Sequence, residues 1–324
     1  MQRLDKALLV VSFGTTHEET RARTIDAIEE HLAKAFPDRK LYRGWTSRMI
    51  VKRLREKCAA DGADPEMGPV RTLTLEEALE QMRADGIRDV LVQPTHMIPG
   101  AENDRMLSAL EESVDRFEQI LAGQPLLSTE EDREHLARTL AEELLGGGQA
   151  ATGEPSGDEE QAEAGVPDGV CRALVLMGHG SANKPEANRI YKEMQQTFQR
   201  LGYDNVFVAT VEGTPALEDV LAAMRLAVKG EDLQEAVLAQ QAVLAPQVVL
   251  APQAVLAPQV VLAPLMIVAG DHAKNDMAGP EEDSWKSRLE AAGYEVSPVL
   301  RGLGEYRAVQ EMLARHAREA VRIK

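Results

Sequence analysis

The sequence predicts an α/β protein made of two similar Rossmann-like lobes, each a parallel sheet flanked by helices, with a candidate active-site cleft between them. Short apolar runs alternate along the chain with segments of helical periodicity, as in βαβ units. The chain has 324 residues, which is long enough for two domains. Residues 11–15 (VSFGT) also resemble residues 177–181 (MGHGS), and this similarity indicates an internal duplication.

The duplication divides the chain into an N-terminal lobe at 1–145 and a C-terminal lobe at 169–324. Between them, residues 146–168 are acidic, rich in Gly, Ala, Glu and Gln, and nearly free of large apolar side chains. Such a composition buries little surface, so this segment is expected to be a flexible linker.

In the N-terminal lobe, residues 7–16 read as a buried strand that leads into a loop. The next segment has a helical apolar face made of Ile25, Ile28, Leu32 and Phe36. A second strand at 90–96 ends in His96, which we align with His272 of the other lobe. A structural role for His96 is the simpler interpretation, and its function is left open.

In the C-terminal lobe, residues 173–181 read as a fully buried strand that ends in the glycine-flanked His179. A helix with apolar spacing follows up to about Phe198. The next strand, from Val206, ends in Glu212, and a Gly-Thr-Pro turn then begins a helix at about 216–227. Residues 266–272 are predicted to be a strand ending in His272, followed by an edge strand at 294–300 and a closing helix at 306–318.

Residues 241–264 are four tandem copies of the hexapeptide Q-[AV]-V-L-A-P, and residues 235–240 look like a degenerate fifth copy. A proline at every sixth position excludes a helix and interrupts a continuous sheet ladder. We interpret 235–264 as an expanded repeat inserted beside a strand. A β-solenoid or a binding tract is the alternative.

Charge and composition exclude several classes of function. The net charge of −17 argues against a nucleic-acid binder, because phosphates would be repelled. No apolar run is long enough to span a membrane, and no signal peptide is visible. Cys58 and Cys171 form no metal-binding or disulfide pattern, which suits the cytoplasm. The oligomeric state stays open, with a homo-oligomer among the alternatives.

Three residues that end predicted strands are candidate metal ligands: His179, Glu212 and His272. The carboxyl ends of parallel strands meet at one edge, so distant residues can converge there. Two imidazoles and one carboxylate suit a borderline divalent metal, and three protein ligands leave coordination positions open. The alternative is that these are ordinary hydrogen-bonding residues.

These motifs resemble the anaerobic cobaltochelatases of the CbiK type, a family of class II chelatases. The resemblance is carried by residues 176–181 (LMGHGS), 211–215 (VEGTP) and 268–277 (VAGDHAKNDM), with 11–16 (VSFGTT) and 93–100 (QPTHMIPG) in the first half. It covers nearly the whole chain apart from the linker and the hexapeptide tract. The tract departs from the family pattern and puts in doubt the register of the strand that leads to His272.

The resemblance implies a chelatase fold and the insertion of Co²⁺ into sirohydrochlorin, or its oxidised form factor II, in cobalamin biosynthesis. It assigns His179, Glu212 and His272 to the metal site. Co²⁺ is then the substrate metal, with Fe²⁺ an alternative, and no organic cofactor is expected. Whether His179 is base, ligand or both is left open. An acidic tetrapyrrole needs local bases, for which the candidates are Arg43, Arg48, Lys184, Arg189 and Lys274.

Two alternatives remain at this point. The first is a sirohydrochlorin ferrochelatase that makes sirohaem, because the ligand types do not distinguish Co²⁺ from Fe²⁺. The second is a cytosolic protein that binds a metal or tetrapyrrole without catalysis. Inactivation of the enzyme by the expanded repeat is a further interpretation.

Overall fold

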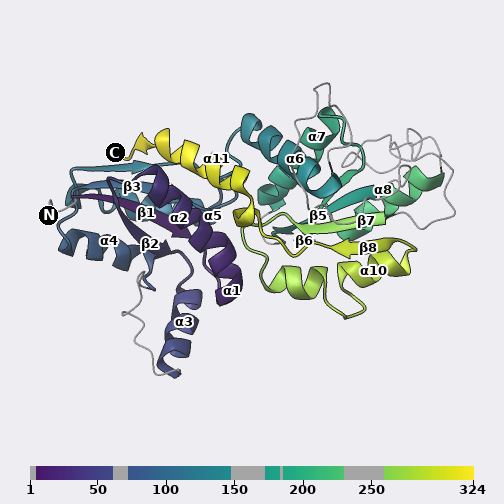
Figure 1. Ribbon diagram of the computed structural model, residues 1–324, viewed down its shortest axis with the longest axis horizontal. Coiled ribbons are helices and arrows are strands. Elements are labelled where there is room, and N and C mark those ends of the chain that lie inside the picture. Colours follow the sequence, from purple (N-terminus) through teal and green to yellow (C-terminus); the bar gives the residue numbers. More distant parts are fainter. Residues whose placement is uncertain (1–4, 61–71, 147–171, 183–184, 230–258) are drawn as a thin grey trace, which may run out of the picture. The chain divides into compact units, whose positions relative to one another are not determined.

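The computed structural model describes residues 5–60, 72–146, 172–182, 185–229 and 259–324 (Figure 1). The chain divides into two compact units. Unit 1 comprises residues 1–132, 266–270 and 302–324, and unit 2 comprises 133–265 and 271–301. Each unit contains one sheet with helices packed on it, so the α/β class and the two-sheet architecture predicted from the sequence are confirmed.

The sheet of unit 1 has the strand order β2-β1-β3-β4-β9. Its first four strands are parallel, and β9 pairs antiparallel with β4 at the edge. The strands are β1 (Lys6–Ser12), β2 (Lys40–Trp45), β3 (Asp89–Pro94), β4 (Gln119–Ala122) and β9 (Val321–Arg322). The internal strand β1 is apolar and buried on both faces, as expected where helices cover a parallel sheet.

The helices of unit 1 come from both ends of the chain. They are α1 (Glu18–Arg21), a π-helical segment (Ala22–Asp26), α2 (Ala27–Ala35), α3 (Arg48–Ala60), α4 (Leu75–Ala84), α5 (Ala101–Glu111) and α11 (Arg307–Arg318). The C-terminal helix α11, yellow in Figure 1, packs against the purple α2. A core cluster joins buried side chains of α4 and α5 to the sheet, and each fully buried large aliphatic side chain contributes about 1.5–3 kcal/mol.

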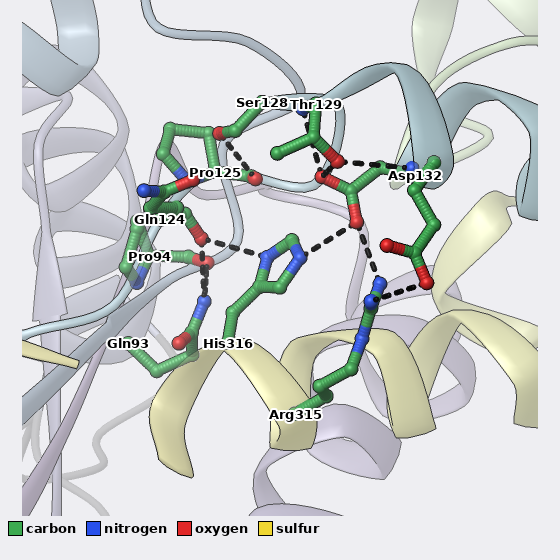
Figure 2. A network of polar contacts seen from close by, with 10 residues as sticks. Gln93, Pro94, Gln124, Pro125, Ser128, Thr129, Asp132, Arg315 and His316 are labelled. Carbon is green, nitrogen blue, oxygen red and sulfur yellow. Dashed lines mark hydrogen bonds and ion pairs between the residues drawn. The ribbon is translucent and has the colours of Figure 1, made fainter. Parts of the chain in front are cut away.

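A buried polar network, which we call the α11 latch, holds α11 in unit 1 (Figure 2). The Asp132 carboxylate, 1% exposed, accepts hydrogen bonds from His316 Nε2 at 2.8 Å and from Arg315 at 2.6 Å. His316 Nδ1 faces the carbonyl of Gln124 at 3.2 Å. Burial alone would raise the pKa of Asp132, but hydrogen bonds from His316 and Thr129 outweigh it and lower the pKa to about 2.

The sheet of unit 2 has the order β6-β5-β7-β8, and all of its strands are parallel. The strands are β5 (Arg172–Gly180), β6 (Val206–Glu212), β7 (Gln259–Pro264) and β8 (Glu295–Pro298). The described helices are α6 (Glu130–Leu145, from residue 133), α7 (Arg189–Arg200), α8 (Leu217–Lys229), a π-helical segment (Ala273–Met277) and α10 (Trp285–Ala291). β8 lies at the edge of the sheet, as predicted.

The hexapeptide tract differs from its sequence interpretation. Its fourth copy, Gln259–Pro264, is not an insertion beside a strand, because it is itself the internal strand β7, and five of its six residues are buried. Proline is compatible with this strand because Pro264 is the last residue of β7, where the sheet ladder ends. The remaining part of the predicted insertion, residues 235–258, lies outside the described residues.

The prediction that residues 266–272 form a strand is wrong. After β7 the chain bends, and residues 266–270 belong to unit 1. The carbonyl of Met266 accepts a hydrogen bond from Leu303 N at 2.8 Å, and that of Ile267 accepts one from Gly304 N at 3.0 Å. A Cβ on Gly302 would lie 2.5 Å from the Ile267 carbonyl oxygen, so this close approach requires glycine. His272 therefore lies at the start of a helical turn and not at a strand end.

The register also corrects the alignment of His96 with His272. Pro94 pairs with Val11 in unit 1, and Pro264 pairs with Met177 in unit 2. The two prolines are therefore equivalent in the duplicated fold, as are the residues at equal distances after them. His96 corresponds to Met266, and the residue that corresponds to His272 is Glu102.

The compact units also differ from the lobes expected at 1–145 and 169–324. Residues 133–145 of α6 belong to unit 2, and residues 302–324, with α11 and β9, belong to unit 1. The physical reason at the C-terminus is that β9 completes the edge of the first sheet and α11 covers α2. The predicted linker lies outside the described residues from residue 147 onward.

Candidate metal centre

The carboxyl end of β5 brings His179 to an exposed position between two glycines. A Cβ on Gly178 would lie 2.1 Å from the buried Tyr191 ring, and burial raises the pKa of that phenol. Gly180 has a φ of +75°, and a Cβ there would lie 2.0 Å from the Glu212 carbonyl oxygen. Both glycines are therefore required by close contacts, and they fix the backbone on each side of His179.

The structure brings His179 and His272 together, although 92 residues separate them in the sequence. Their ring centroids lie 4.6 Å apart and the rings meet edge to face at 86°. His179 comes from the end of β5. His272 comes from the turn that begins the π-helical segment Ala273–Met277. Both residues belong to unit 2, so this unit contains the histidine pair by itself.

Hydrogen bonds at Nδ1 set the orientation of both rings. His179 Nδ1 donates to the carbonyl of Gly180 at 2.9 Å, and His272 Nδ1 donates to the Asp276 carboxylate at 2.5 Å. Because each Nδ1 faces an oxygen acceptor, each neutral ring carries its lone pair on Nε2. Orientation of this kind is typical of histidines that bind a metal through Nε2.

Asp276 is a functional candidate that the sequence analysis did not single out. It lies four residues after His272, so one helical turn places its carboxylate beside the imidazole. The signal in the sequence was this spacing, His-x-x-x-Asp, directly after the Gly-Asp pair 270–271.

Glu212 is the last residue of β6 and is exposed. It pairs in register with Gly180, so both residues point to one face of the sheet, whereas His179 precedes Gly180 and points to the other. In the part of the chain that the structure describes, no three His, Cys, Asp or Glu side chains converge as a metal-ligand set. The structure therefore brings together two of the three predicted ligands, and the role of Glu212 stays a prediction.

The loop after β5 is held by Asn188, which is buried. Its amide accepts a hydrogen bond from Ser181 N at 2.8 Å and donates one to Ser181 O at 3.1 Å. Gly213 has a φ of +105°, and a Cβ there would lie 2.3 Å from the Asn188 amide nitrogen. Asn188 therefore connects the residue after β5 with the turn after β6.

The predicted basic residues have different environments. The prediction that Arg43 contacts the substrate is wrong. Arg43 lies inside β2, is only 7% exposed, and forms ion pairs with Glu29 and Asp26. Arg48 and Arg189 are exposed and form ion pairs with Glu76 and Glu193. Lys184 lies outside the described residues. Lys274 is half-buried, two residues after His272.

His96 is buried in unit 1, two residues after β3. Burial lowers the pKa of His96 to about 4, against opposing effects of the Glu102 carboxylate and the Asn103 amide. The residue is thus a neutral imidazole near pH 7.

No helix in the described ranges of the chain is both long and apolar enough to cross a lipid bilayer.

Comparisons with known proteins agree with the motifs and the fold. The profile of the family described as cobalt chelatase (CbiK) matches residues 6–149 and 166–322. The sirohydrochlorin cobaltochelatase of Salmonella typhimurium is 32% identical, with 98% of this chain and 97% of that protein covered. The sirohydrochlorin cobaltochelatase CbiKC of Nitratidesulfovibrio vulgaris is 28% identical, with 98% and 90% covered.

Among solved structures, SirB from Bacillus subtilis with Fe³⁺ superposes with a TM-score of 0.56. It is 15% identical, and the match covers 97% of this chain and 94% of SirB. At this identity the likeness concerns the fold alone. The family match spans nearly the whole chain and includes the strand ends that carry His179 and the turn that carries His272, so the chain belongs to the CbiK cobalt chelatase family.

Proposed function

We propose that this protein is a metal chelatase that inserts Co²⁺ into sirohydrochlorin, or its oxidised form factor II, in anaerobic cobalamin biosynthesis. The observation that carries the proposal is the histidine pair of unit 2. Two imidazoles lie 4.6 Å apart, and each is tied at Nδ1 to an oxygen, so that both Nε2 atoms are available for chemistry. The names of the relatives in this family support the choice of substrate.

Insertion of a divalent metal into a tetrapyrrole releases two pyrrole N–H protons. A neutral imidazole accepts such a proton near pH 7. We assign this role to His179, because its ring is exposed at the carboxyl end of β5 and its Nδ1–H is held by the neutral carbonyl of Gly180.

The metal must be held loosely enough to pass into the ring. We assign its delivery to His272, with Glu212 as a predicted further ligand. The Asp276 carboxylate that holds His272 Nδ1 increases the basicity of Nε2, which favours metal binding. A site with few protein ligands keeps coordination positions open for the pyrrole nitrogens.

Sirohydrochlorin carries several carboxylates, whereas the protein has a net charge of −17. Local positive charge is therefore needed near the histidine pair. Lys274 lies two residues from His272 on the same helical segment, and we propose that it contacts a substrate carboxylate. Imidazole and carboxylate ligands also suit Fe²⁺, so the test compares Co²⁺ with Fe²⁺.

The test is the change in visible absorption when sirohydrochlorin and Co²⁺ are mixed with the purified protein, beside parallel reactions with Fe²⁺ and Ni²⁺. We expect Co²⁺ insertion well above the protein-free rate, and its loss in His179→Ala and in His272→Ala. His135→Ala, at an exposed histidine of α6, is the matched control and should keep the parent rate. If Co²⁺ insertion is no faster with the protein than without it, the protein is not a chelatase, and the interpretation as a binding protein remains. Faster insertion of Fe²⁺ than of Co²⁺ would favour the ferrochelatase alternative.

A further inference from the structure

Tyr191, the third residue of α7, reaches the backbone at the end of β5 with its hydroxyl group. Its phenol oxygen accepts a hydrogen bond from Gly180 N at 3.3 Å. Burial raises the pKa of this phenol, and hydrogen bonds from the backbone of Gly180 and of His179 oppose that effect. The side chain is only 9% exposed, so its hydroxyl is placed to act through the backbone and not on a bound substrate.

The aromatic ring and the hydroxyl of Tyr191 make separate contacts. The ring packs on the backbone of Gly178, where an added Cβ would lie 2.1 Å from it. A phenylalanine ring would fill the same space, so this packing does not require the hydroxyl. The contact that requires it is the hydrogen bond from Gly180 N. Tyr191→Phe therefore removes one contact and keeps the other.

Gly180 lies between two peptide planes, and each plane is held by a side chain from the segment after β5. Tyr191 holds the plane that joins His179 to Gly180, through the Gly180 N–H. Asn188 holds the next plane, because its amide oxygen accepts a hydrogen bond from Ser181 N at 2.8 Å. A peptide unit is planar, so fixing its N–H also fixes the direction of its carbonyl. The Gly180 carbonyl, which belongs to the second plane, therefore has a defined direction.

The direction of this carbonyl decides which nitrogen of the His179 ring carries the proton. His179 Nδ1 lies 2.9 Å from the Gly180 oxygen, and a carbonyl only accepts, so Nδ1 is the donor. The Nε2 atom then has the lone pair that a proton acceptor needs. The imidazole is attached beside the first peptide plane and its acceptor belongs to the second, so the hydrogen bond between them requires that both planes keep their orientation.

We propose that Tyr191 is a positioning residue for the proposed reaction, whose hydroxyl holds the peptide between His179 and Gly180 and thereby keeps the lone pair of the imidazole on Nε2. The use of Nε2 as a proton acceptor rests on the proposed function, whereas the position of the ring proton is a property of the protein without substrate. Tyr191 does not touch the reacting atoms, and its effect passes through the backbone.

The test compares Tyr191→Phe with the parent protein, both as the full chain, freed of metal and without any tetrapyrrole. In protein labelled with ¹⁵N in histidine, long-range ¹H–¹⁵N spectra distinguish a protonated ring nitrogen from one that carries a lone pair. The spectra are recorded at about pH 8, where an ordinary histidine is neutral. The signals of His179 are identified by their absence in His179→Ala. We expect the proton on Nδ1 of His179 in the parent, and both tautomers in Tyr191→Phe because the backbone is no longer held.

Steady-state Co²⁺ insertion supplies the second readout. Loss of a group that positions a catalytic residue lowers kcat and leaves substrate binding in place. In Tyr191→Phe, kcat should fall by about tenfold, with KM for sirohydrochlorin within about twofold of the parent value. Tyr203→Phe is the matched control, because it removes the same hydroxyl near the other end of α7, where Tyr203 packs edge to face on Phe198. It should change neither readout.

A proton that stays entirely on Nδ1 of His179 in Tyr191→Phe would overturn the proposal. A parent spectrum with this proton on Nε2 would overturn it as well, and that outcome needs no variant, so it decides the matter if Tyr191→Phe does not fold. Near-ultraviolet circular dichroism verifies the fold of each variant. Absence of Co²⁺ insertion by the parent would contradict the proposed function alone, because the tautomer is measured in the free protein.

Discussion

His179 and His272, the histidine pair of unit 2, differ in what holds their Nδ1–H groups. His179 donates to a backbone carbonyl, whereas His272 donates to the Asp276 carboxylate. A carboxylate stabilises positive charge on the ring and strengthens its Nε2 as a ligand. This difference supports the division of roles in which His272 holds the metal and His179 receives the proton.

The first prediction concerns this tether. Asp276→Asn removes the negative charge but keeps the side-chain size, so kcat/KM for Co²⁺ insertion should fall by about 10–100-fold. Steady-state assays over a range of Co²⁺ concentration check it. Asp283→Asn, at an exposed acid of the same unit, should leave kcat/KM unchanged. Equal rates for Asp276→Asn and the parent would show that the hydrogen bond does not tune His272.

The second prediction concerns the backbone beside His179. Gly180→Ala places a Cβ 2.0 Å from a backbone oxygen at a φ of +75°, so the backbone itself must shift. We expect a loss of stability of about 2–4 kcal/mol, as for overpacking combined with backbone strain. Gly202→Ala is the matched control, because its φ is +83° and nothing lies within 4 Å of the added Cβ. It should cost only about 1 kcal/mol by urea unfolding. Similar losses in both variants would contradict the clash.

At the scale of elements, strand β7 is one unit of a tandem repeat. A hexapeptide has an even number of residues, so replacing one copy by another keeps every side chain on its face of the sheet. Residues 247–252 have the same sequence as β7, and the other copies differ by Ala for Val. Any single copy joined to Leu265 can therefore supply the strand.

The third prediction follows from this repeat. Deletion of 241–258, which is three copies, leaves β7 with its own sequence and should preserve the melting temperature and the insertion rate. Deletion of Val261 alone shifts the register by one residue and should destabilise unit 2 severely, because side chains that pack on one buried face of the sheet are moved to the other. Circular dichroism melting of the two variants checks this. A three-copy deletion that unfolds the protein would contradict the interchangeability of the copies.

The fourth prediction concerns the α11 latch. The pKa of Asp132 is lowered to about 2 from an ordinary value of 3.8. A group whose pKa is lowered by folding stabilises the protein above its unfolded value and loses that contribution as the pH falls through the folded value. The latch should thus contribute about 1–2 kcal/mol above pH 4, and this should disappear between about pH 4 and pH 2.

Asp132→Asn should remove this part of the pH dependence of the free energy of unfolding. Urea titrations at pH 7, 4 and 3 check it. Asp38→Asn, whose exposed carboxylate pairs with Lys6, is the control and should follow the parent. Parallel pH curves for Asp132→Asn and the parent would mean that the buried contact with His316 contributes nothing.

The sequence predicts those strands and helices whose hydrophobic patterns lie within a short stretch of residues. The apolar runs of β1, β5 and β6 and the helical spacing of α7 and α11 are visible in short windows. β7 was missed because its proline looked like an interruption, whereas a proline at every sixth residue fits a six-residue strand that ends at the proline. His272 was placed on the wrong element because the bend at residues 266–270 depends on contacts with residues 302–304, far away in sequence.

For the candidate site, too, the sequence predicted the features that have a local signal and missed those that depend on distant contacts. The glycines around His179 revealed an exposed strand end, and the resemblance supplied His272. Three features could not be read from short stretches of sequence, because they arise from strand register and helix geometry. They are the contact between the rings of His179 and His272, the hydrogen bond of His272 to Asp276, and the orientation of Glu212 towards the other face of the sheet. Arg43 was misjudged because its partners, Asp26 and Glu29, lie on another element.

At the scale of the whole molecule, the chain enters each unit more than once. Unit 1 is completed by residues 302–324, and the buried residues of α11 include Val309, Met312 and Leu313. Three such side chains correspond to about 5–9 kcal/mol of burial, comparable to the total stability of a domain. The first unit therefore depends on the last segment of the chain.

The fifth prediction tests this dependence. A fragment of residues 1–145 should keep helical far-ultraviolet circular dichroism but lack a fixed near-ultraviolet spectrum and bind a hydrophobic dye. The same fragment joined by a Gly/Ser linker to residues 302–324 should regain near-ultraviolet signal and lose dye binding. A cooperative thermal transition in the unlinked fragment would contradict this dependence on α11.

The completion of unit 1 by α11 also has a consequence for how the protein is made. Residues 1–145 leave the ribosome before α11 has been synthesised. At about 5–20 residues per second, roughly 10–35 s pass between the synthesis of residue 145 and that of residue 324. During that time the nascent first sheet lacks the helix that covers α2. We expect chaperones that bind nascent chains to engage residues 1–145, and we expect α11 to close the first unit once it has been synthesised.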